Sequence, residues 1–337
     1  MKILFLGPIK SSFAKNDIEI LQKDFELSII NSSTGRGIKG IFNLMKCIVL
    51  STIYLIKSDV VFSWFADYTS LVPVFLAKLF KKKSIVIAGG FDVGYQPQLN
   101  YGAIMKPIRW FCVRNTFKYA DKIIPVSNYA AEALMRLTGK DYWAKTEVIY
   151  NGIKSEKFSL PENENRNIFL TVSQAHSDIE FKLKGSDTFI KIAAENPNYE
   201  FKLVGLRGEA LNEAKKMAMN IKNIEVIEGP LNLYTELIPL YQKSFAYIQL
   251  SIEESFGVAV VEAMKCGCVP IISNNSALPE ISGKFAKIIN TPSDITSALQ
   301  FSVEANITLR TAISNYSETF DIKYREEKLL NLINNLL

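Results

Sequence analysis

The chain has 337 residues, of which 48% are hydrophobic and 22% are charged, and it contains only 17 Gly and 12 Pro. This composition excludes a disordered, collagen-like or low-complexity protein. Because one hydrophobic core rarely organises more than about 250–300 residues, the length predicts two domains. The four cysteines form no disulfide framework and have no C-x-x-C spacing for zinc, so we expect a reducing compartment.

Two apolar runs near the N-terminus are short. The run at residues 2–7 stops at Pro8, which is too short for the hydrophobic region of a secretory signal, and we interpret it as the first strand. The longest apolar run, residues 47–56, has ten residues, about half of what a membrane-spanning helix needs. The sequence therefore predicts no membrane span.

Short aliphatic or β-branched runs alternate with longer helical patterns, which is typical of βαβ units on a parallel sheet. The expected strands are residues 2–7, 27–30, 59–64, 84–88 and 122–126 in the first half, and 168–173, 200–205, 224–228, 245–250, 269–273 and 285–289 in the second. The sequence predicts an α/β fold of two Rossmann-like domains. Their parallel sheets would face a cleft, with ligands at the carboxyl ends of the strands.

Charge divides the chain as well. Residues 1–165 hold 22 Lys and Arg against 14 Asp and Glu, a net +8, whereas residues 166–337 hold 17 against 20, a net −3. Residues 154–167 are polar and interrupted by Pro161, the composition of an interdomain linker. We therefore expect one domain over residues 1–153 and a second over residues 168–315.

The most informative stretch is residues 252–281. A strand leads into a loop with Glu254, and a helix is expected to begin near Gly257 and to end at Gly267. The N–H groups of Phe256, Gly257 and Val258 would point out of this helix start, where an anion gains about 0.3–1 kcal/mol from the helix dipole. A diphosphate would bind there, and Gly257, which lacks a Cβ, would let it approach the backbone closely.

Glu254 and Glu262 lie eight positions apart, one in the loop and one in the second helical turn. A carboxylate accepts hydrogen bonds from vicinal diols, so the two acids would hold sugar hydroxyls on either side of the phosphates. The alternative is that both are solvated acids near a helix end.

This stretch resembles the retaining glycosyltransferases of the GT-B fold, group 1 or family 4 type. The resemblance rests on E-x7-E at Glu254 and Glu262, followed by EAM at 262–264, Gly267, Pro270 and LPEI at 278–281. Further similar motifs are ADKIIPVS at 120–127, VIYNGI at 148–153, Lys184 with Gly185, and KLVG at 202–205. The resemblance also implies that the domain over residues 1–153 binds the acceptor and that the domain over residues 168–315 binds the nucleotide sugar. It implies further that a final helix, within residues 316–337, returns to the N-terminal domain.

The resemblance implies roles for individual residues. Glu262 would bind the ribose of a nucleotide sugar, Glu254 would contact the transferred hexose, and Lys184 would neutralise the diphosphate leaving group. A fixed cation and N–H donors stabilise the charge that develops on the departing phosphates, so we expect no metal cofactor. Further donor contacts are expected at Gln174, Gly205, Gly229 and Leu231.

The chain departs from the family after the strand that ends at Ser173. Many relatives carry an Arg shortly after that strand, and here Gln174 takes its place. Lys182, in the long loop that follows, is an alternative source of the missing charge. We interpret His176 and the acids Asp178 and Glu180 in the same stretch as surface loop residues.

A second departure lies at residues 87–94. Many relatives have a His-Gly pair where this chain has Gly89 and Gly90, and Asp92 takes the position of an acid often found two residues later. The two glycines would touch a sugar or form a tight turn, and Asp92 would bind a donor or acceptor hydroxyl. Lys10, in the loop after the first strand, is expected to contact the acceptor or to be solvated.

Two stretches of the first half are both basic and apolar, residues 75–84 and 105–119. In the second, Lys106, Trp110, Arg114 and Lys118 recur every fourth residue, which predicts a basic helical stripe that would rest on anionic lipid or face solvent. The sequence has no zinc finger, RNA-recognition signature or long basic tract, so we expect no nucleic acid as a partner.

The sequence thus predicts a cytoplasmic enzyme, peripheral on the inner face of the plasma membrane. It would transfer a hexose with retention from a nucleotide diphosphate sugar, a UDP-sugar being favoured, to a glycan or polyprenyl-linked acceptor in polysaccharide, lipopolysaccharide or capsule synthesis. Two alternatives remain: a degenerate glycosyltransferase that acts as a non-catalytic partner subunit, and a GT-B nucleotide-sugar epimerase.

Overall fold

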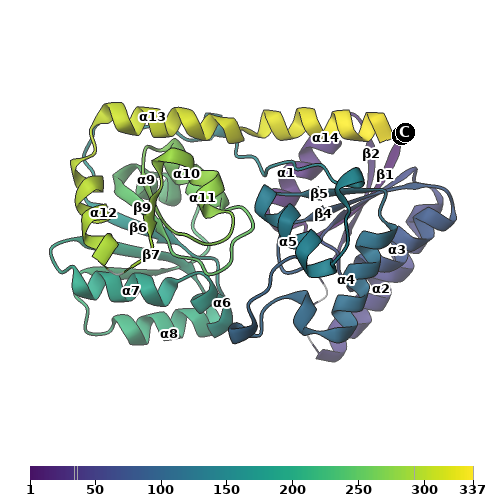
Figure 1. The fold of residues 1–337 in the computed structure, drawn as a ribbon, viewed down its shortest axis with the longest axis horizontal. Coiled ribbons are helices and arrows are strands. Elements are labelled where there is room, and N and C mark those ends of the chain that lie inside the picture. The colour runs from purple at the N-terminus through teal and green to yellow at the C-terminus, as the bar shows by residue number, and fades with distance from the viewer. Residues whose placement is uncertain (34, 36, 292, 337) are drawn as a thin grey trace. The chain divides into compact units, whose positions relative to one another are not determined.

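The computed structural model describes residues 1–33, 35, 37–291 and 293–336. The chain divides into two compact units, one of Met1–Gly152 with Ile322–Leu337 and one of Ile153–Asp321. Each unit is a parallel sheet whose strands alternate with helices (Figure 1). Residues 154–167, for which the sequence predicts a linker, are counted with the second unit, and Arg166 among them is buried.

The first unit contains a five-stranded parallel sheet with the order β2-β1-β3-β4-β5. Its strands are β1 (Lys2–Gly7), β2 (Glu26–Asn31), β3 (Val60–Trp64), β4 (Lys83–Ala88) and β5 (Lys122–Pro125). β1 pairs with both β2 and β3, with Ile3 opposite Val60. The central strands are apolar along nearly their whole length and almost completely buried, as expected for a sheet covered on both faces.

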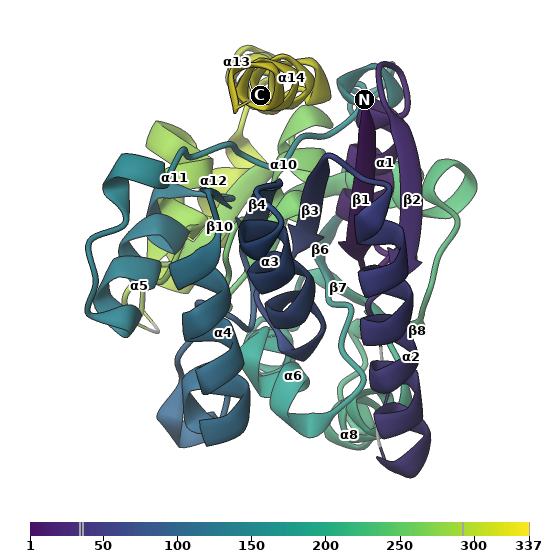
Figure 2. The same cartoon turned by 90° about the vertical axis from the view of Figure 1, so that its right-hand side faces the viewer.

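Helices cover both faces of this sheet. They are α1 (Ser12–Leu21), α2 (Gly37–Ile56), α3 (Tyr68–Leu79), α4 (Pro107–Tyr119), α5 (Asn128–Thr138) and the C-terminal α14 (Ile322–Leu336). α2, α3 and α4 stand next to one another in one layer (Figure 2). α14 packs on α1, where Arg325 pairs through two nitrogens with the buried Asp17 at 2.7 and 2.8 Å. This bidentate pair fixes the C-terminal helix to the first unit.

The second unit contains a six-stranded parallel sheet with the order β11-β10-β9-β6-β7-β8. Its strands are β6 (Ile168–Val172), β7 (Glu200–Leu206), β8 (Ile224–Glu228), β9 (Ser244–Gln249), β10 (Val269–Ser273) and β11 (Lys287–Ile289). The chain runs from β6 to β8 in one direction and from β9 to β11 in the other. The direction of winding therefore changes between the adjacent strands β6 and β9, the position at which doubly wound sheets bind ligands.

The helices of the second unit lie on the two faces of its sheet. They are α6 (Asp178–Leu183), α7 (Ser186–Glu195), α8 (Gly208–Ala218), α9 (Ile238–Lys243), α10 (Val258–Lys265), α11 (Leu278–Ser282), α12 (Ser293–Glu304) and α13 (Ile307–Ser317). In Figure 1, α7 and α8 lie below the sheet, and α9 and α10 lie above it. This alternation is the doubly wound arrangement that the sequence predicts.

All eleven strands that the sequence predicts are present, and most of their ends agree to within one residue. The assignment of residues 178–183 to a loop is wrong, because they form α6. Ser177 and Glu180 cap this short helix reciprocally, each side chain accepting a bond from the other's backbone N–H. The spacing of these two residues signals the helix in the sequence.

The basic stripe predicted in α4 is partly wrong. Lys106 precedes the helix, and Trp110 is half-buried. The exposed side of α4 instead presents Ile108 and Phe111 together with the basic Arg114 and Lys118. The stripe is therefore more apolar than a four-residue repeat of basic residues suggests.

Candidate functional site

The loop from β9 to α10 lies at the position where the winding of the second sheet reverses. Glu254 is held in this loop through its backbone: its N–H donates to Ser276 Oγ at 2.9 Å, and its carbonyl accepts from the N–H of Ala277 at 3.0 Å. Gly257, with φ +94°, turns the chain into α10, which begins at Val258. Val260 and Val261 donate their N–H groups to the carbonyl of Gly257, at 3.0 and 3.4 Å, so an anion at this end would meet the N–H groups at the very start of the helix.

The side chain of Glu254 binds two groups from other elements. Its Oε2 accepts from Lys184 Nζ at 2.6 Å and from Gln249 Nε2 at 2.8 Å. Lys184 and Glu254 retain 31% and 15% side-chain exposure, so this pair can be reached from solvent. The structure thus brings together two of the residues that the sequence assigns to the donor.

Lys184 reaches Glu254 because the end of α6 is held against the end of β9. Gly185, directly after Lys184, has φ +68°, and a Cβ there would lie 2.2 Å from the carbonyl oxygen of Leu250. The N–H of Ile252 donates to the carbonyl of Leu183 at 2.8 Å. The close approach requires glycine at position 185, and it fixes the distance between the cation and the acid.

Gln249, the last residue of β9, is a site residue that the sequence analysis missed. It is 6% exposed, and besides Glu254 its Nε2 contacts Ser251 Oγ at 3.2 Å. Within the described part of the chain, its buried Oε1 accepts no hydrogen bond. A polar residue that ends an otherwise apolar strand was the available signal.

Glu262 lies in the second turn of α10, and its Oε2 accepts from the hydroxyl of Tyr241 at 2.9 Å. Burial raises the pKa of the Glu262 carboxyl to about 7, although the bond from Tyr241 lowers it. Burial also raises the pKa of Tyr247, and the negative charges of Glu254 and Glu262 both raise it further. The ring of Tyr247 packs against that of Tyr241, with centroids 6.0 Å apart, so it lies next to the residue that contacts Glu262.

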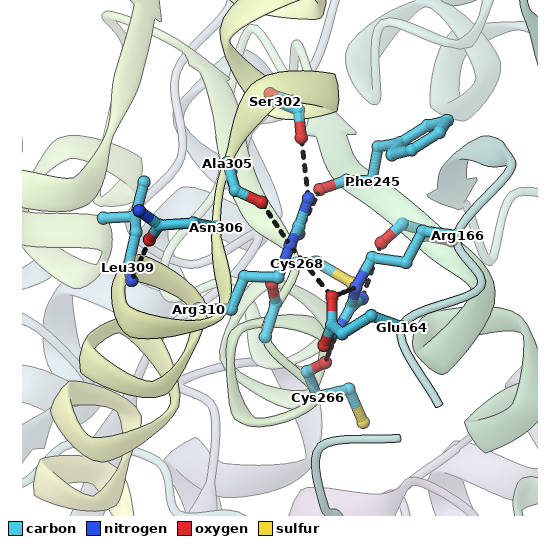
Figure 3. A network of polar contacts seen from close by, with 12 residues as sticks. Glu164, Arg166, Phe245, Cys266, Cys268, Ser302, Ala305, Asn306, Leu309 and Arg310 are labelled. Carbon is cyan, nitrogen blue, oxygen red and sulfur yellow. Dashed lines mark hydrogen bonds and ion pairs between the residues drawn. The ribbon is translucent and has the colours of Figure 1, made fainter. Parts of the chain in front are cut away.

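Two buried arginines support the far end of α10 (Figure 3). Arg166 donates to the carbonyls of Ser244 and Cys266 at 2.7 and 2.9 Å, and Arg310 donates to those of Phe245 and Gly267, each at 2.9 Å. Burial and the charge of Arg166 lower the pKa of Arg310 to about 10. These bonds tie the end of α10 to the start of β9 and thereby fix the helix that carries Glu262.

The cysteines beside this network are structural. Cys266 and Cys268 are completely buried and free, and Cys268 Sγ donates to the carbonyl of Tyr241 at 3.0 Å. Burial raises the pKa of the Cys268 thiol to about 11, which keeps it protonated at neutral pH.

The ends of β7 and β8 meet at two glycines. A Cβ on Gly229 would lie 2.6 Å from the Cα of Gly205, so the loop that continues to the half-buried Leu231 passes very close to β7. Arg207, which the sequence analysis missed, donates from Nε to the carbonyl of Gly229 at 2.8 Å. It directly follows the last residue of β7, as expected for a residue at a ligand-binding edge.

The remaining predicted donor residues differ in their surroundings. Gln174 is exposed in the loop after β6. Lys182 pairs with Asp178 one helical turn away, at 2.8 Å, on the exposed side of α6, so it is engaged there rather than at Glu254. The ring of Phe256 is buried and packs edge-on against Phe320, with centroids 5.6 Å apart, while Val258 is half-buried at the start of α10.

Asp92 in the first unit is 3% exposed, and its carboxylate accepts backbone bonds from Gly90 at 3.0 Å, Ala66 at 3.2 Å and Gly89 at 3.3 Å. Burial raises its pKa to about 6. These bonds hold the turn after β4, whereas a contact to a sugar hydroxyl stays a prediction.

The other predicted residues of the first unit have different surroundings. A Cβ on Gly89 would lie 2.5 Å from Val126, so close packing accounts for glycine at this position. Lys10 is exposed after β1.

Comparison with known proteins finds a family match over most of the second unit. Residues 152–305 match the family described as glycosyl transferases group 1. The O-antigen chain mannosyltransferase RfbU of Salmonella typhimurium is 24% identical over 230 residues, which are 67% of this chain and 62% of that protein. The chain therefore spans less than two thirds of the length of this curated relative.

Solved structures share the fold over the whole chain. Sucrose-phosphate synthase from Thermosynechococcus elongatus has a TM-score of 0.81 at 14% identity, covering 100% of this chain and 99% of that one. Anabaena HepE in complex with UDP has a TM-score of 0.76 at 14% identity, covering 100% of both chains. Residues 152–305 thus match the group 1 glycosyl transferases, and the architecture of the chain is that of the GT-B fold.

Proposed function

We propose that the protein is a hexosyltransferase that uses a nucleotide diphosphate sugar. The acceptor is a glycan or a polyprenyl-linked glycan, and the enzyme acts in the cytoplasm, peripheral on the inner face of the plasma membrane. The observation that carries the proposal is the contact between Lys184 Nζ and Glu254 Oε2 in front of the start of α10. A cation, an acid and the N–H donors at the start of α10 would then lie at one ligand-binding edge.

The chemistry follows from this arrangement. Bond cleavage at the anomeric carbon leaves negative charge on the diphosphate, which Lys184 and the N–H groups at the start of α10 stabilise more strongly in the transition state than in the bound substrate. These groups provide the charge stabilisation without a metal cofactor. The incoming hydroxyl attacks from the side on which the phosphate departs, and the phosphate accepts its proton, so that configuration is retained.

Glu254 and Glu262 bind the two sugars of the donor. Glu254, oriented by Lys184 and Gln249, accepts from hydroxyls of the hexose, and Glu262, oriented by Tyr241, accepts from the ribose. The ribose diol donates best to an ionised carboxylate, so donor binding requires the charged form of Glu262. Because the pKa of Glu262 is raised to about 7, the donor KM is expected to rise as the pH falls below that value.

For the nucleobase and the hexose of the donor, the proposal draws on the similar proteins. The HepE structures contain UDP and UDP-glucose, which favours a UDP-sugar, whereas the Salmonella relative is named a mannosyltransferase. Base selection would involve the backbone near Gly229 and the guanidinium of Arg207.

The first experiment is a thermal-shift screen with UDP, GDP, ADP, CDP and dTDP. A nucleotide at 100 times its Kd stabilises the protein by about 2.7 kcal/mol. The best nucleotide then identifies the donor for a transfer assay with Glu262→Ala, in which we expect a raised donor KM or lost turnover. Glu195→Ala, an exposed acid at the end of α7, is the matched control. Unchanged donor KM and rate in Glu262→Ala would refute the assigned role.

A further inference from the structure

One side of α2 is apolar and exposed. Seven residues three or four positions apart form a single stripe along the helix, each at least 53% exposed, and Ile38 reaches 88%: Ile38, Ile41, Phe42, Met45, Val49, Ile53 and Ile56. The opposite side, with Gly40, Cys47, Ser51 and Leu55, is buried. A helix of a water-soluble domain normally has its apolar stripe turned inward. α2 has the reverse orientation, with its larger apolar stripe facing outward.

The neighbouring helices extend this surface. α2 packs beside α3, and α3 packs beside α4, so the three form one layer of the first unit (Figure 2). α3 adds Phe75 at 44% and Leu79 at 63% exposure, and α4 adds Ile108 at 75% and Phe111 at 57%. We call this surface, formed by the exposed residues of the three helices, the α2–α4 face. Apolar exposure on neighbouring elements at this scale marks an interaction site.

The charges on the α2–α4 face have one sign. The sequences of α2, α3 and α4 contain no Asp or Glu. Their exposed basic residues are Lys39, Lys46, Lys78, Arg114 and Lys118. The remaining basic residue, Arg109, is paired with Asp67 at the start of α3. The face therefore combines apolar side chains with uncompensated positive charge.

We infer that the α2–α4 face docks on an anionic lipid bilayer, with α2 lying in the plane of the interface. The apolar stripe would enter the boundary between headgroups and acyl chains, while the lysines beside it would contact anionic headgroups. Each basic residue near such a surface strengthens binding about fivefold. A second copy of the chain is the poorer occupant, because it would bring two positively charged faces together.

α2 has the length and composition of a membrane-spanning helix, but its contacts favour an interfacial position. Only 22% of the apolar stretch of α2 is buried, but this buried side packs on α3 and on the sheet of its own unit. Lys82 also donates to the carbonyls of Leu55 and Ile56 at 2.6 and 2.8 Å, which caps the end of the helix from the loop before β4. A spanning helix would have to lose these contacts.

The inference is independent of the proposed transfer reaction, because vesicle binding can be measured without any sugar. The full chain is sedimented with vesicles of phosphatidylcholine alone and with vesicles that contain phosphatidylglycerol. We expect sedimentation with the anionic vesicles and much less with the neutral ones, and we expect the binding to weaken as salt is raised. Equal binding to both, or binding to neither, would overturn the inference.

Two double variants separate the contribution of the apolar side chains to vesicle binding from that of the basic ones. Phe42→Ser with Val49→Ser removes apolar groups and should reduce binding to anionic vesicles by roughly tenfold or more. Lys39→Glu with Lys46→Glu should have an effect of at least that size, because it reverses two favourable charges. The matched control is Met219→Ser with Ile307→Ser, two exposed apolar residues of the second unit, at 76% and 50% exposure. Thermal unfolding checks that every variant is folded.

The oligomeric state in solution tests whether a second copy of the chain, rather than lipid, covers the α2–α4 face. If the α2–α4 face joins two copies of the chain, the wild type is a dimer by size-exclusion chromatography and Phe42→Ser with Val49→Ser is a monomer. That result, together with unchanged vesicle binding, would replace the lipid surface by a protein partner. A wild type whose mass does not respond to the variant supports the lipid surface.

Discussion

Two acids, Asp92 and Glu254, lie in loops after strands of the two sheets, but their partners differ. Asp92 in the first unit accepts hydrogen bonds from three backbone N–H groups, at 3.0 to 3.3 Å. Glu254 in the second unit accepts from two side chains, Lys184 and Gln249, at 2.6 and 2.8 Å. The first acid is 3% exposed, whereas the side chain of the second keeps 15% exposure.

The difference separates a structural acid from one that is available to a ligand. The Asp92 carboxylate accepts these N–H groups within the turn, so its removal takes away their acceptor at a site that is largely shielded from water. The side chain of Lys184, which is 31% exposed, can turn toward a ligand without disturbing the sheet. Substitution should therefore damage folding at the first site and activity at the second.

The largest effect is expected for Lys184→Ala. Loss of a group that stabilises developing charge typically costs about 10²–10³ in kcat. Folding should hardly change, because the ammonium and the Glu254 carboxylate are both partly exposed. Steady-state kinetics with the best donor measure the first effect, and thermal unfolding measures the second.

Lys182→Ala is the matched control for Lys184→Ala. Lys182 lies two residues earlier on α6 and pairs with Asp178 on the exposed side of the helix. Its substitution should leave kcat within about twofold, since exposed pairs contribute little. Equal losses in the two variants would show that Lys182 also supplies the charge that Gln174 lacks, and would contradict the expectation that Lys184 alone of the two acts on the donor.

A smaller effect, this time on stability, is expected for Asp92→Ala. Removing the acceptor of three N–H groups, that of the buried Ala66 and those of the half-buried Gly89 and Gly90, should lower the free energy of unfolding of the first unit by about 2–4 kcal/mol. All three tryptophans, Trp64, Trp110 and Trp143, belong to this unit, so urea unfolding followed by tryptophan fluorescence reports on it selectively. Unchanged unfolding with lost transfer activity would instead assign Asp92 to a substrate hydroxyl.

The sequence was sufficient for the strands and for the central acids. Apolar runs such as 2–7 and 269–273 match the observed strands because a parallel strand covered on both faces must be apolar throughout. Glu254, Glu262 and Lys184 were found through a family pattern. Their contacts were not predictable, because Lys184 meets Glu254 across 70 residues of chain.

The supporting residues and the outward stripe of α2 were not predictable by the same means. Gln249 and Tyr241 are single polar residues in apolar surroundings, and only the fold shows which carboxylate each contacts. The sequence shows a short apolar run at residues 47–56, but the helix α2 that contains this run already begins at Gly37. A periodic apolar pattern predicts that one side of a helix is buried, and it cannot tell which of two apolar sides that will be.

The smallest expected effect is the pH dependence conferred by Glu262. The pKa of its carboxyl is raised from 4.5 to about 7 in the folded chain, so between these values the folded state binds more protons than the unfolded state. The stability associated with this group is complete below about pH 4.5 and is lost as the pH rises through 7. Because the side chain of Glu262 is only half-buried, we expect a loss of stability on the order of 1–2 kcal/mol.

The variant Glu262→Gln tests this pH dependence, because its amide oxygen can still accept from Tyr241 but does not titrate. The decline in its stability between pH 5 and pH 8 should be smaller than in the wild type, as measured by thermal unfolding followed by circular dichroism. Asp92, also raised, to about 6, contributes in the same direction in both proteins, so only the difference between the two curves reports on Glu262. Curves that fall in parallel would mean that water reaches Glu262 freely, and the predicted rise of the donor KM as the pH falls below about 7 would then lose its physical basis.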